Sequence, residues 1–314
     1  MTMNSVLCRD LGLKYPIIQG GMAYITTGPM AAASSNAGGL GMICSSGLSA
    51  AEVAAEVAKC RELTDKPYGV NLMLQSPEIK DIIQVVIDNK VPIVATGAGD
   101  PSPYMPQLLA AGIKVMPVIP NVRAAVKAAS LGAYAVVAEG TESGGHVGEM
   151  ATLPLVSQVL KAVDIPVLAA GGIADGKAMA AMMLMGAAGV QMGTVFLVAD
   201  ECPISAEYKQ QILAAKDTDT IVTGRGTPHV VRSLKNSMSL KYAELEKQPG
   251  TEEERHKLSD KALLKAVKGD VEGGCLMAGQ ISGQITKGGK IADIMAAITA
   301  EAEQTLLKAA GLVG

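Results

Sequence analysis

The stretch AYAVVAEGTESGGHVGE, residues 133–149, joins an apolar run to a polar, glycine-rich segment. A continuous apolar run such as residues 133–138 is typical of a strand buried on both faces, and the segment after it is then a loop at the strand's carboxyl end. In α/β proteins this end of the sheet carries the chemistry. The loop contains His146, one of three histidines in the chain, among glycines that let a backbone approach a ligand closely. An ordinary solvated loop is the alternative reading.

Seven further apolar runs of the same kind alternate with alanine-rich segments of helical period. We expect the eight strands at residues 16–22, 39–44, 67–74, 92–99, 114–120, 133–140, 166–172 and 189–196. Most are separated by helical segments long enough for parallel crossovers, and Ser49 with Glu52 fits a capping box at the start of one helix. Eight such units favour a closed α/β barrel, the TIM (β/α)8 fold, over an open doubly wound sheet.

Composition limits the function classes. Of the 314 residues 49% are hydrophobic and 18% charged, which supplies a large core and excludes a disordered chain. The net charge is -3, there is no basic block and Trp is absent, which argues against nucleic acid as a partner. The five cysteines are scattered and fit no metal-site spacing, so we expect reduced thiols and no metal site of that type. Without a signal-like start or a membrane-length apolar run, a cytoplasmic protein with no membrane contact is predicted.

The alternating pattern stops after Phe196. We expect residues 1–200 to form the barrel, residues 201–274 a small helical cap that screens the mouth from water, and residues 275–314 a return to the barrel ending in a closing helix. The cap contains two histidines. His256 lies among charged residues and is expected to be solvated, whereas His229 could line the pocket. Two of its arginines could meet ligand phosphates or simply lie at the surface, namely Arg225 and Arg232.

Six of the eight expected strand ends are polar or glycine-rich, as if built to line one pocket. In phosphate-binding barrels the loops after the last two strands offer backbone N–H groups to the anion. Here those loops predict a phosphate cradle of Gly171, Gly172, Gly193 and Thr194. Met22, Asn71 and Gln191 lie at other strand ends, where a flat ring could be bound. The pattern predicts a phosphorylated ligand without specifying it. Glu139 and Glu142 lie near enough in sequence to orient or tune His146.

Several motifs together resemble one family. The segments PIIQGGMA (16–23), DKPYGVNLML (65–74), TGAGDP (96–101), AEGTESGGHVG (138–148), AAGGIADG (169–176), VQMGT (190–194) and GDVEGGCLMAGQISG (269–283) are similar to the FMN-dependent enoyl-acyl-carrier-protein reductase II family, FabK, within the nitronate monooxygenase-like flavin barrels. The resemblance covers nearly the whole chain. Tyr24 departs from it, since a Trp is often found at that position, and so does the Cys44-Ser45-Ser46 turn.

The resemblance implies non-covalent FMN that is reduced by NAD(P)H and passes a hydride to the β-carbon of an enoyl thioester in fatty acid elongation, with His146 as the catalytic acid. It also implies a homodimer, a small-molecule or acyl-carrier-protein-bound enoyl substrate, and a monovalent cation whose ligands it does not identify. The cofactor-binding residues that we expect are Gly21, Met22, Ala23, Asn71, Glu139, Gly144, Gly145, Gly171, Gly172, Gln191, Met192, Gly193, Thr194 and Gln280.

Other functions fit parts of this pattern. A nitronate monooxygenase or an NADH:quinone reductase shares several of the motifs. A colourless phosphate-sugar isomerase or aldolase would use the same anion cradle, and a flavin-binding protein without turnover would need the cradle alone.

Overall fold

The computed structural model describes residues 4–227, 229–309 and 311. Eight parallel strands form a closed barrel in the order β1-β2-β3-β4-β5-β6-β8-β9, so the predicted TIM barrel is confirmed. Each predicted strand corresponds to one of these. Their bounds are β1 Ile17–Gln19, β2 Leu40–Cys44, β3 Tyr68–Met73, β4 Ile93–Gly97, β5 Lys114–Ile119, β6 Val136–Glu139, β8 Val167–Ala170 and β9 Gly189–Met192.

The strands read as apolar runs because both of their faces are buried. Side chains such as Ile18, Met42 and Leu168 fill the barrel interior, while neighbours such as Val70 and Val94 pack against the surrounding helices. The helices around the barrel are α2 Gly28–Asn36, α3 Ala50–Leu63, α4 Ile79–Asp88, α5 Met105–Ala110, α6 Val122–Ser130, α7 Thr152–Ala162, α8 Gly176–Leu184 and the short α9 Thr194–Leu197. The helix α1 (Val6–Leu11) adds Leu7 and Leu11 to the interior cluster.

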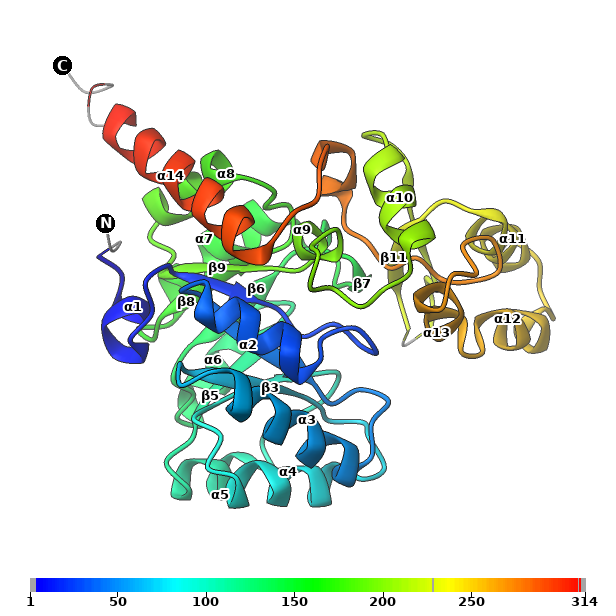
Figure 1. Cartoon of the computed structure of the whole chain (residues 1–314). Coiled ribbons are helices and arrows are strands. Elements are labelled where there is room, and N and C mark those ends of the chain that lie inside the picture. The colour runs from blue at the N-terminus through cyan, green and yellow to red at the C-terminus, as the bar shows by residue number, and fades with distance from the viewer. Residues whose placement is uncertain (1–3, 228, 310, 312–314) are drawn as a thin grey trace.

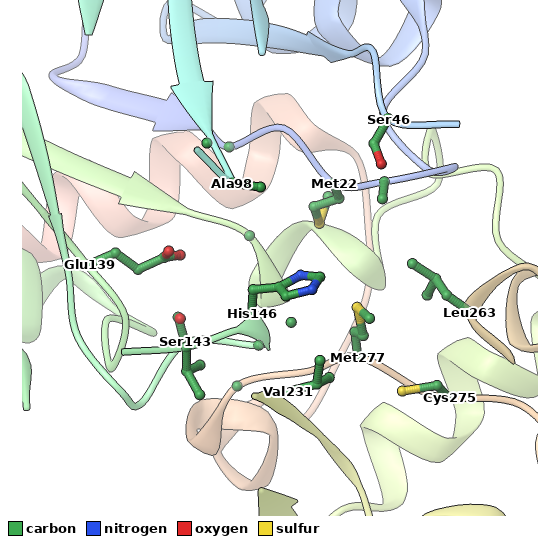
Figure 2. A pocket seen from close by; sticks show the side chains of 18 of the residues that line it. Met22, Ser46, Ala98, Glu139, Ser143, His146, Val231, Leu263, Cys275 and Met277 are labelled. Atoms are coloured by element: carbon green, nitrogen blue, oxygen red, sulfur yellow. The ribbon is translucent and has the colours of Figure 1, made fainter. Parts of the chain in front are cut away.

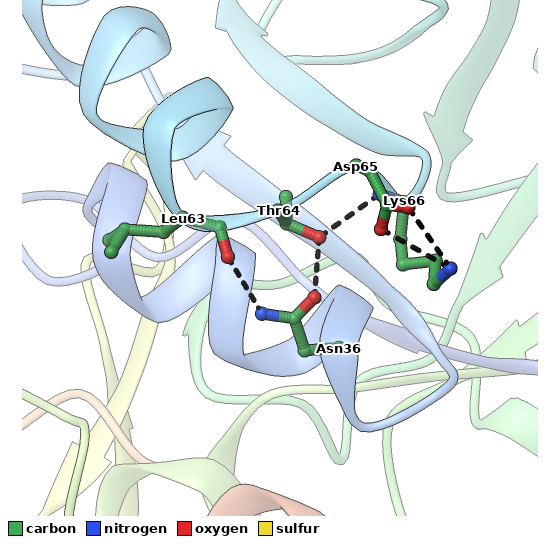
Figure 3. Close-up of polar contacts among 5 residues, drawn as sticks. All are labelled: Asn36, Leu63, Thr64, Asp65 and Lys66. Carbon is green, nitrogen blue, oxygen red and sulfur yellow. Dashed lines mark hydrogen bonds and ion pairs between the residues drawn. The ribbon is translucent and has the colours of Figure 1, made fainter.

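Helix ends follow the local sequence. Ser49 caps α3 and forms the predicted capping box with Glu52. At the other end of α3, Asn36 at the end of α2 donates to the carbonyl of Leu63 at 2.9 Å and accepts from the Thr64 hydroxyl at 2.6 Å (Figure 3). Lys66 N–H donates to the same hydroxyl at 3.1 Å. These bonds join two helix ends and direct the chain into β3.

The cap differs from the expected helical segment because it also contains strands. Its helices are α10 Ala206–Ala214, α11 Ser237–Glu246, α12 Glu252–Ser259 and α13 Ala262–Val267. The hairpin β10 (Thr220–Thr223) and β11 (Val231–Leu234) pairs antiparallel with β7 (Gly145–His146), which belongs to the loop after β6. In Figure 1 these elements lie together at one side of the barrel. The cap is therefore joined by main-chain hydrogen bonds to the segment that carries His146.

After the cap the chain packs against barrel helices again. The 3-10 helix η1 (Gln280–Gln284) packs near α9 and α10, and the long α14 (Ile291–Ala309) packs along α8 (Figure 1). All five cysteines are buried and free. Within the residues that the structure describes, no helix combines the length and the apolar character needed to cross a bilayer.

Candidate active site

One large pocket of about 900 Å³ opens at the carboxyl ends of the barrel strands, beneath the cap. That volume lies near the upper end of the range for small-molecule sites. The six polar strand ends singled out in the sequence all line it. Of the predicted site residues it brings together His146, Gly21, Met22, Ala23, Asn71, Glu139, Gly144, Gly145, Gly171, Gly172, Gln191, Met192, Gly193 and Thr194.

Gln280 is the predicted site residue that the structure does not place in the pocket. Its side chain is exposed at the start of η1, while its neighbours Gly279 and Ile281 line the pocket. The backbone N–H of Gln280 donates to the carbonyl of Glu142 at 2.9 Å, and that of Gly279 donates to the Thr194 hydroxyl at 3.0 Å. This segment therefore supports the site through its backbone.

Three of the four residues of the predicted phosphate cradle are glycines, whose backbone is not covered by a side chain. Gly171 and Gly172 have φ of +86° and +73°, in the left-handed region that favours glycine. Gly193 precedes α9, whose first N–H groups lack partners within the helix. A Cβ atom on Gly193 would meet nothing closer than Met22 Sδ at 3.6 Å, so it would project into the pocket. An anion can thus approach this backbone closely.

Gly20 and Gly21, directly after β1, leave room for two polar side chains on β3 and β9. A Cβ atom on Gly21 would lie 2.4 Å from Asn71 Cβ, and one on Gly20 would lie 3.1 Å from Gln191 Cγ. The missing side chains allow Asn71 and Gln191 to stand against the β1 turn. Their amides, which offer both donors and acceptors, line the pocket where a planar heterocycle can be hydrogen-bonded.

His146 lies in β7, on the cap side of the pocket. In Figure 2 its ring projects into the cavity between Met22 and Met277. It meets the ring of His229 edge to face, with the centroids 6.0 Å apart, so the structure places His229 at the pocket. Burial, and then the charge of His229, lower the pKa of His146 below its ordinary value.

Neither acid of the loop has the expected contact with His146. The carboxylate of Glu142 accepts from the backbone N–H of Thr152 at 3.0 and 3.1 Å and from its hydroxyl at 3.0 Å, so it caps the start of α7. Glu139 lies deeper in the pocket, beside Ser143 (Figure 2). Burial raises the pKa of Glu139 to about 7.

Ser143 was not among the predicted site residues, although it lies within the same loop. Its hydroxyl is buried, lines the pocket and has no hydrogen-bond partner among the described residues. A buried polar group without a partner is costly, so this hydroxyl fits a site that receives a polar ligand. The serine in ESGGH was the available sequence signal.

The two cap arginines have different environments. Arg232 is buried and paired within the protein: its Nε donates to the Thr141 carbonyl and its Nη1 to the Thr220 hydroxyl, both at 2.9 Å. It therefore joins the cap hairpin to the His146 loop, and it neither lines the pocket nor lies at the surface, the two alternatives that the sequence left open. Arg225 is exposed in the hairpin turn. His256 is exposed too, yet it lines the outer part of the pocket.

Tyr24 forms one wall of the mouth. Its backbone is in the left-handed region at φ 60°, and its ring lies against Gly47, where a Cβ atom would come within 2.1 Å. The side chain remains 40% exposed beside the pocket, so its ring can contact a bound ligand.

Among the described residues no three His, Cys, Asp or Glu side chains cluster as a metal site would require. The pocket instead offers backbone N–H groups, amides, hydroxyls and three imidazoles. This set suits an organic, phosphorylated cofactor.

Comparisons with known proteins agree with this geometry. The family model described as nitronate monooxygenase matches residues 4–301. The structure of FabK from Thermotoga maritima superimposes with a TM-score of 0.95 at 39% identity, covering 99% of this chain and 100% of that one. A Rhodococcus jostii protein, (3aS,4S,5R,7aS)-5-hydroxy-7a-methyl-1-oxo-octahydro-1H-indene-4-carboxyl-CoA dehydrogenase, is 37% identical over 77% of this chain and 69% of its own length. A probable nitronate monooxygenase of Staphylococcus saprophyticus is 35% identical over 78% of this chain and 82% of its own. The chain belongs to the nitronate monooxygenase family, and it is a flavin-dependent oxidoreductase built on a (β/α)8 barrel.

Proposed function

We propose that the protein is an FMN-dependent enoyl-acyl-carrier-protein reductase that uses NAD(P)H and acts on enoyl thioesters in fatty acid elongation. The likeness to FabK over the full length supports this activity, and the likeness to a carboxyl-CoA dehydrogenase supports a thioester substrate. The observation that carries the proposal is the position of His146, whose ring projects into a pocket large enough for a flavin and a second ligand.

The pocket residues fit FMN. Gly172, Gly193 and Thr194 would hold the phosphate through backbone N–H groups and a hydroxyl, in a cradle that a Cβ atom on Gly193 would fill. Asn71 and Gln191 would bind the edge of the ring system. The chemistry that bound FMN would supply is hydride transfer from the nicotinamide to the substrate.

His146 would serve the proton side of this reaction. When a hydride reaches the β-carbon of an enoyl thioester, negative charge develops on the thioester oxygen and the α-carbon. An imidazole N–H directed at that oxygen stabilises the charge and can transfer a proton. Because β7 pairs with β11, the main chain of His146 is held by the cap while its ring faces the substrate space.

The test combines absorbance spectroscopy with turnover. Under anaerobic conditions NADH or NADPH should bleach the flavin of the purified protein, and crotonyl thioester should restore its colour. His146→Ala should slow the second step by about 10²-fold or more while FMN stays bound. Unchanged reoxidation in this variant would remove His146 from the mechanism, and a flavin that nicotinamides do not bleach would contradict the proposed activity.

Nitronate monooxygenase is the second candidate, supported by the family model and by the staphylococcal relative. In that reaction an alkyl nitronate would reduce the flavin and oxygen would reoxidise it. Anaerobic bleaching by propionate 3-nitronate, with none by NADH or NADPH, would establish this activity in place of the reductase.

A further inference from the structure

The helix α12 presents a polar face to the pocket. Glu252, Arg255, His256 and Ser259 all line the cavity, and their spacing of three and four residues places them on one side of the helix. A helix that covers a cavity usually turns its apolar side inward. The neighbouring helices do so, since α11 contributes Met238 and α13 contributes Leu263 and Leu264. In α12 none of the residues is buried.

Arg255 is the group on this face whose hydrogen-bonding capacity is least used. Its side chain is only 14% exposed, and its Nε is buried with no hydrogen-bond partner among the described residues. Its Nη2 lies 3.4 Å from a carboxylate oxygen of Glu252, a side chain that is 72% exposed and therefore well screened. A buried guanidinium N–H without an acceptor is unfavourable unless a ligand supplies one.

Lys261 adds a second positive charge at the same end of the pocket. It lines the cavity and has φ of 51°, a left-handed conformation that is uncommon for a residue with a side chain. Among the residues of α12, α13 and the turn between them that line the pocket, Glu252 is the single acid, against Arg255, Lys261 and His256. This end of the pocket is therefore suited to an anion.

We propose that Arg255 and Lys261 bind a phosphoryl group at the far end of an extended ligand whose reactive end lies at His146. The inference rests on the proposed function, because enoyl thioesters of phosphopantetheine carry a phosphate beyond a long uncharged arm. Leu263, Cys275 and Met277 lie on the cap side of His146 and would contact that arm (Figure 2). The planar guanidinium fork matches phosphate oxygens in pairs. The nicotinamide dinucleotide is the other source of such a phosphate.

Binding is tested on the FMN-loaded protein without a reductant, so that no turnover occurs. Crotonyl-phosphopantetheine and crotonyl-pantetheine, which differ by one phosphate, are titrated by calorimetry into the wild type, Arg255→Gln and Arg61→Gln. The last variant makes the same change on the exposed face of α3, outside the pocket. Arg255→Gln should weaken binding of the phosphorylated thioester about tenfold and leave the other thioester unaffected. Arg61→Gln should change neither affinity.

A second variant removes the concern that Arg255→Gln perturbs the cap. Lys261→Gly deletes the charge at a backbone conformation that glycine prefers, so the fold should be retained while affinity for the phosphorylated thioester falls. Weaker binding of NADP⁺ in both variants, with thioester affinities unchanged, would assign the same phosphate site to the dinucleotide. The proposal would be overturned if crotonyl-phosphopantetheine, crotonyl-pantetheine and NADP⁺ each bound Arg255→Gln and Lys261→Gly as tightly as they bind the wild type.

The proposed activity is judged separately. Failure of the wild type to reduce crotonyl thioesters would reject the reductase while the phosphate-dependent binding still stood. Normal reduction together with unaltered binding in Arg255→Gln would reject the phosphate site and leave the reductase in place.

Discussion

At the scale of single residues, burial moves the pKa values of two groups in the pocket in opposite directions. It raises the pKa of Glu139 to about 7 and lowers the pKa of His146. Both shifts favour the uncharged form, because a desolvated charge is unfavourable in either group. Near neutral pH, Glu139 and His146 therefore bring less charge to the pocket than the same two residues would carry in water. This suits a flat, largely uncharged ring.

The pH dependence of turnover should respond to His229. If protonated His146 is the acid, kcat/KM falls as pH rises through its lowered pKa, below the ordinary 6.5. His229→Gln removes the neighbouring positive charge, which is the smaller of the two causes, so the falling limb should move to higher pH yet remain below the ordinary value. The pH profile of thioester reduction measures this shift. A limb that does not move would mean that His229 does not influence the pKa of His146.

Glu139 should make the flavin-free protein less stable in alkaline solution. Its folded pKa of about 7 lies above the ordinary 4.5, so the folded state retains the proton more tightly than the unfolded state. Stability should therefore fall as pH rises from about 4.5 to 7 and stay reduced above that. Glu139→Gln should stabilise the apoprotein by roughly 3 kcal/mol at pH 8 and by almost nothing at pH 4.5. Chemical denaturation at the two pH values measures the free energy of unfolding. An equal increase at both pH values would mean that the variant acts through packing and not through ionisation.

At the scale of elements, the antiparallel sheet β10-β11-β7 is the feature that gives the barrel a cap. Val231 pairs with His146 and Arg232 with Gly145, and Val147 N–H donates to the Val230 carbonyl at 3.0 Å. The Nε of Arg232 adds one side-chain bond across the same seam, to the Thr141 carbonyl, and its Nη1 binds Thr220 within the hairpin. The hairpin and the His146 loop thus behave as one unit.

Replacing Arg232 should loosen that unit. Arg232→Met keeps the length of the side chain but removes the buried cation and its two hydrogen bonds, each worth about 1.5 kcal/mol, so the free energy of unfolding should drop by roughly 3 kcal/mol. Amide hydrogen exchange at residues 141–148 should accelerate. Arg225→Met, at an exposed turn position, is the matched comparison and should leave both measurements unchanged. Equal exchange in the two variants would contradict the role given to Arg232.

The sequence predicted the elements that are local in character and missed those that depend on distant partners. All eight barrel strands were predictable because each is buried on both faces and therefore reads as an apolar run. The strand β7 was not, since it has two residues in a glycine loop and its partner lies far along the chain. The polar inner face of α12 was not predictable because its sequence carries no apolar stripe, and His256 was expected to be solvated. The contact of Glu142 with Thr152 likewise depends on a turn that no local pattern specifies.

At the scale of the whole molecule, the flavin should contribute to stability as a ligand that binds only the folded barrel. FMN at a hundred times its dissociation constant adds about 2.7 kcal/mol. Riboflavin, which lacks the phosphate, should add much less at the same concentration. Scanning calorimetry of the apoprotein with each compound measures the difference.

The substitution Gly193→Ala tests phosphate binding at the cradle without disturbing the rest of the fold. Its Cβ atom would meet Met22 at an ordinary distance, so the Tm of the apoprotein should stay within a degree or so of the wild type. The same atom would occupy the space of the phosphate, so the advantage of FMN over riboflavin should disappear. If FMN still raises the Tm more than riboflavin does, the phosphate is held elsewhere.

The pairing of β7 with β11 links the opening of the pocket mouth to the position of His146. Any outward swing of the hairpin must draw the backbone of His146 with it, because the two share a ladder of main-chain bonds. An opened mouth would then lack its acid, and a closed one would regain it. A substrate that enters through the open mouth would therefore meet the imidazole of His146 only after the hairpin has closed over it.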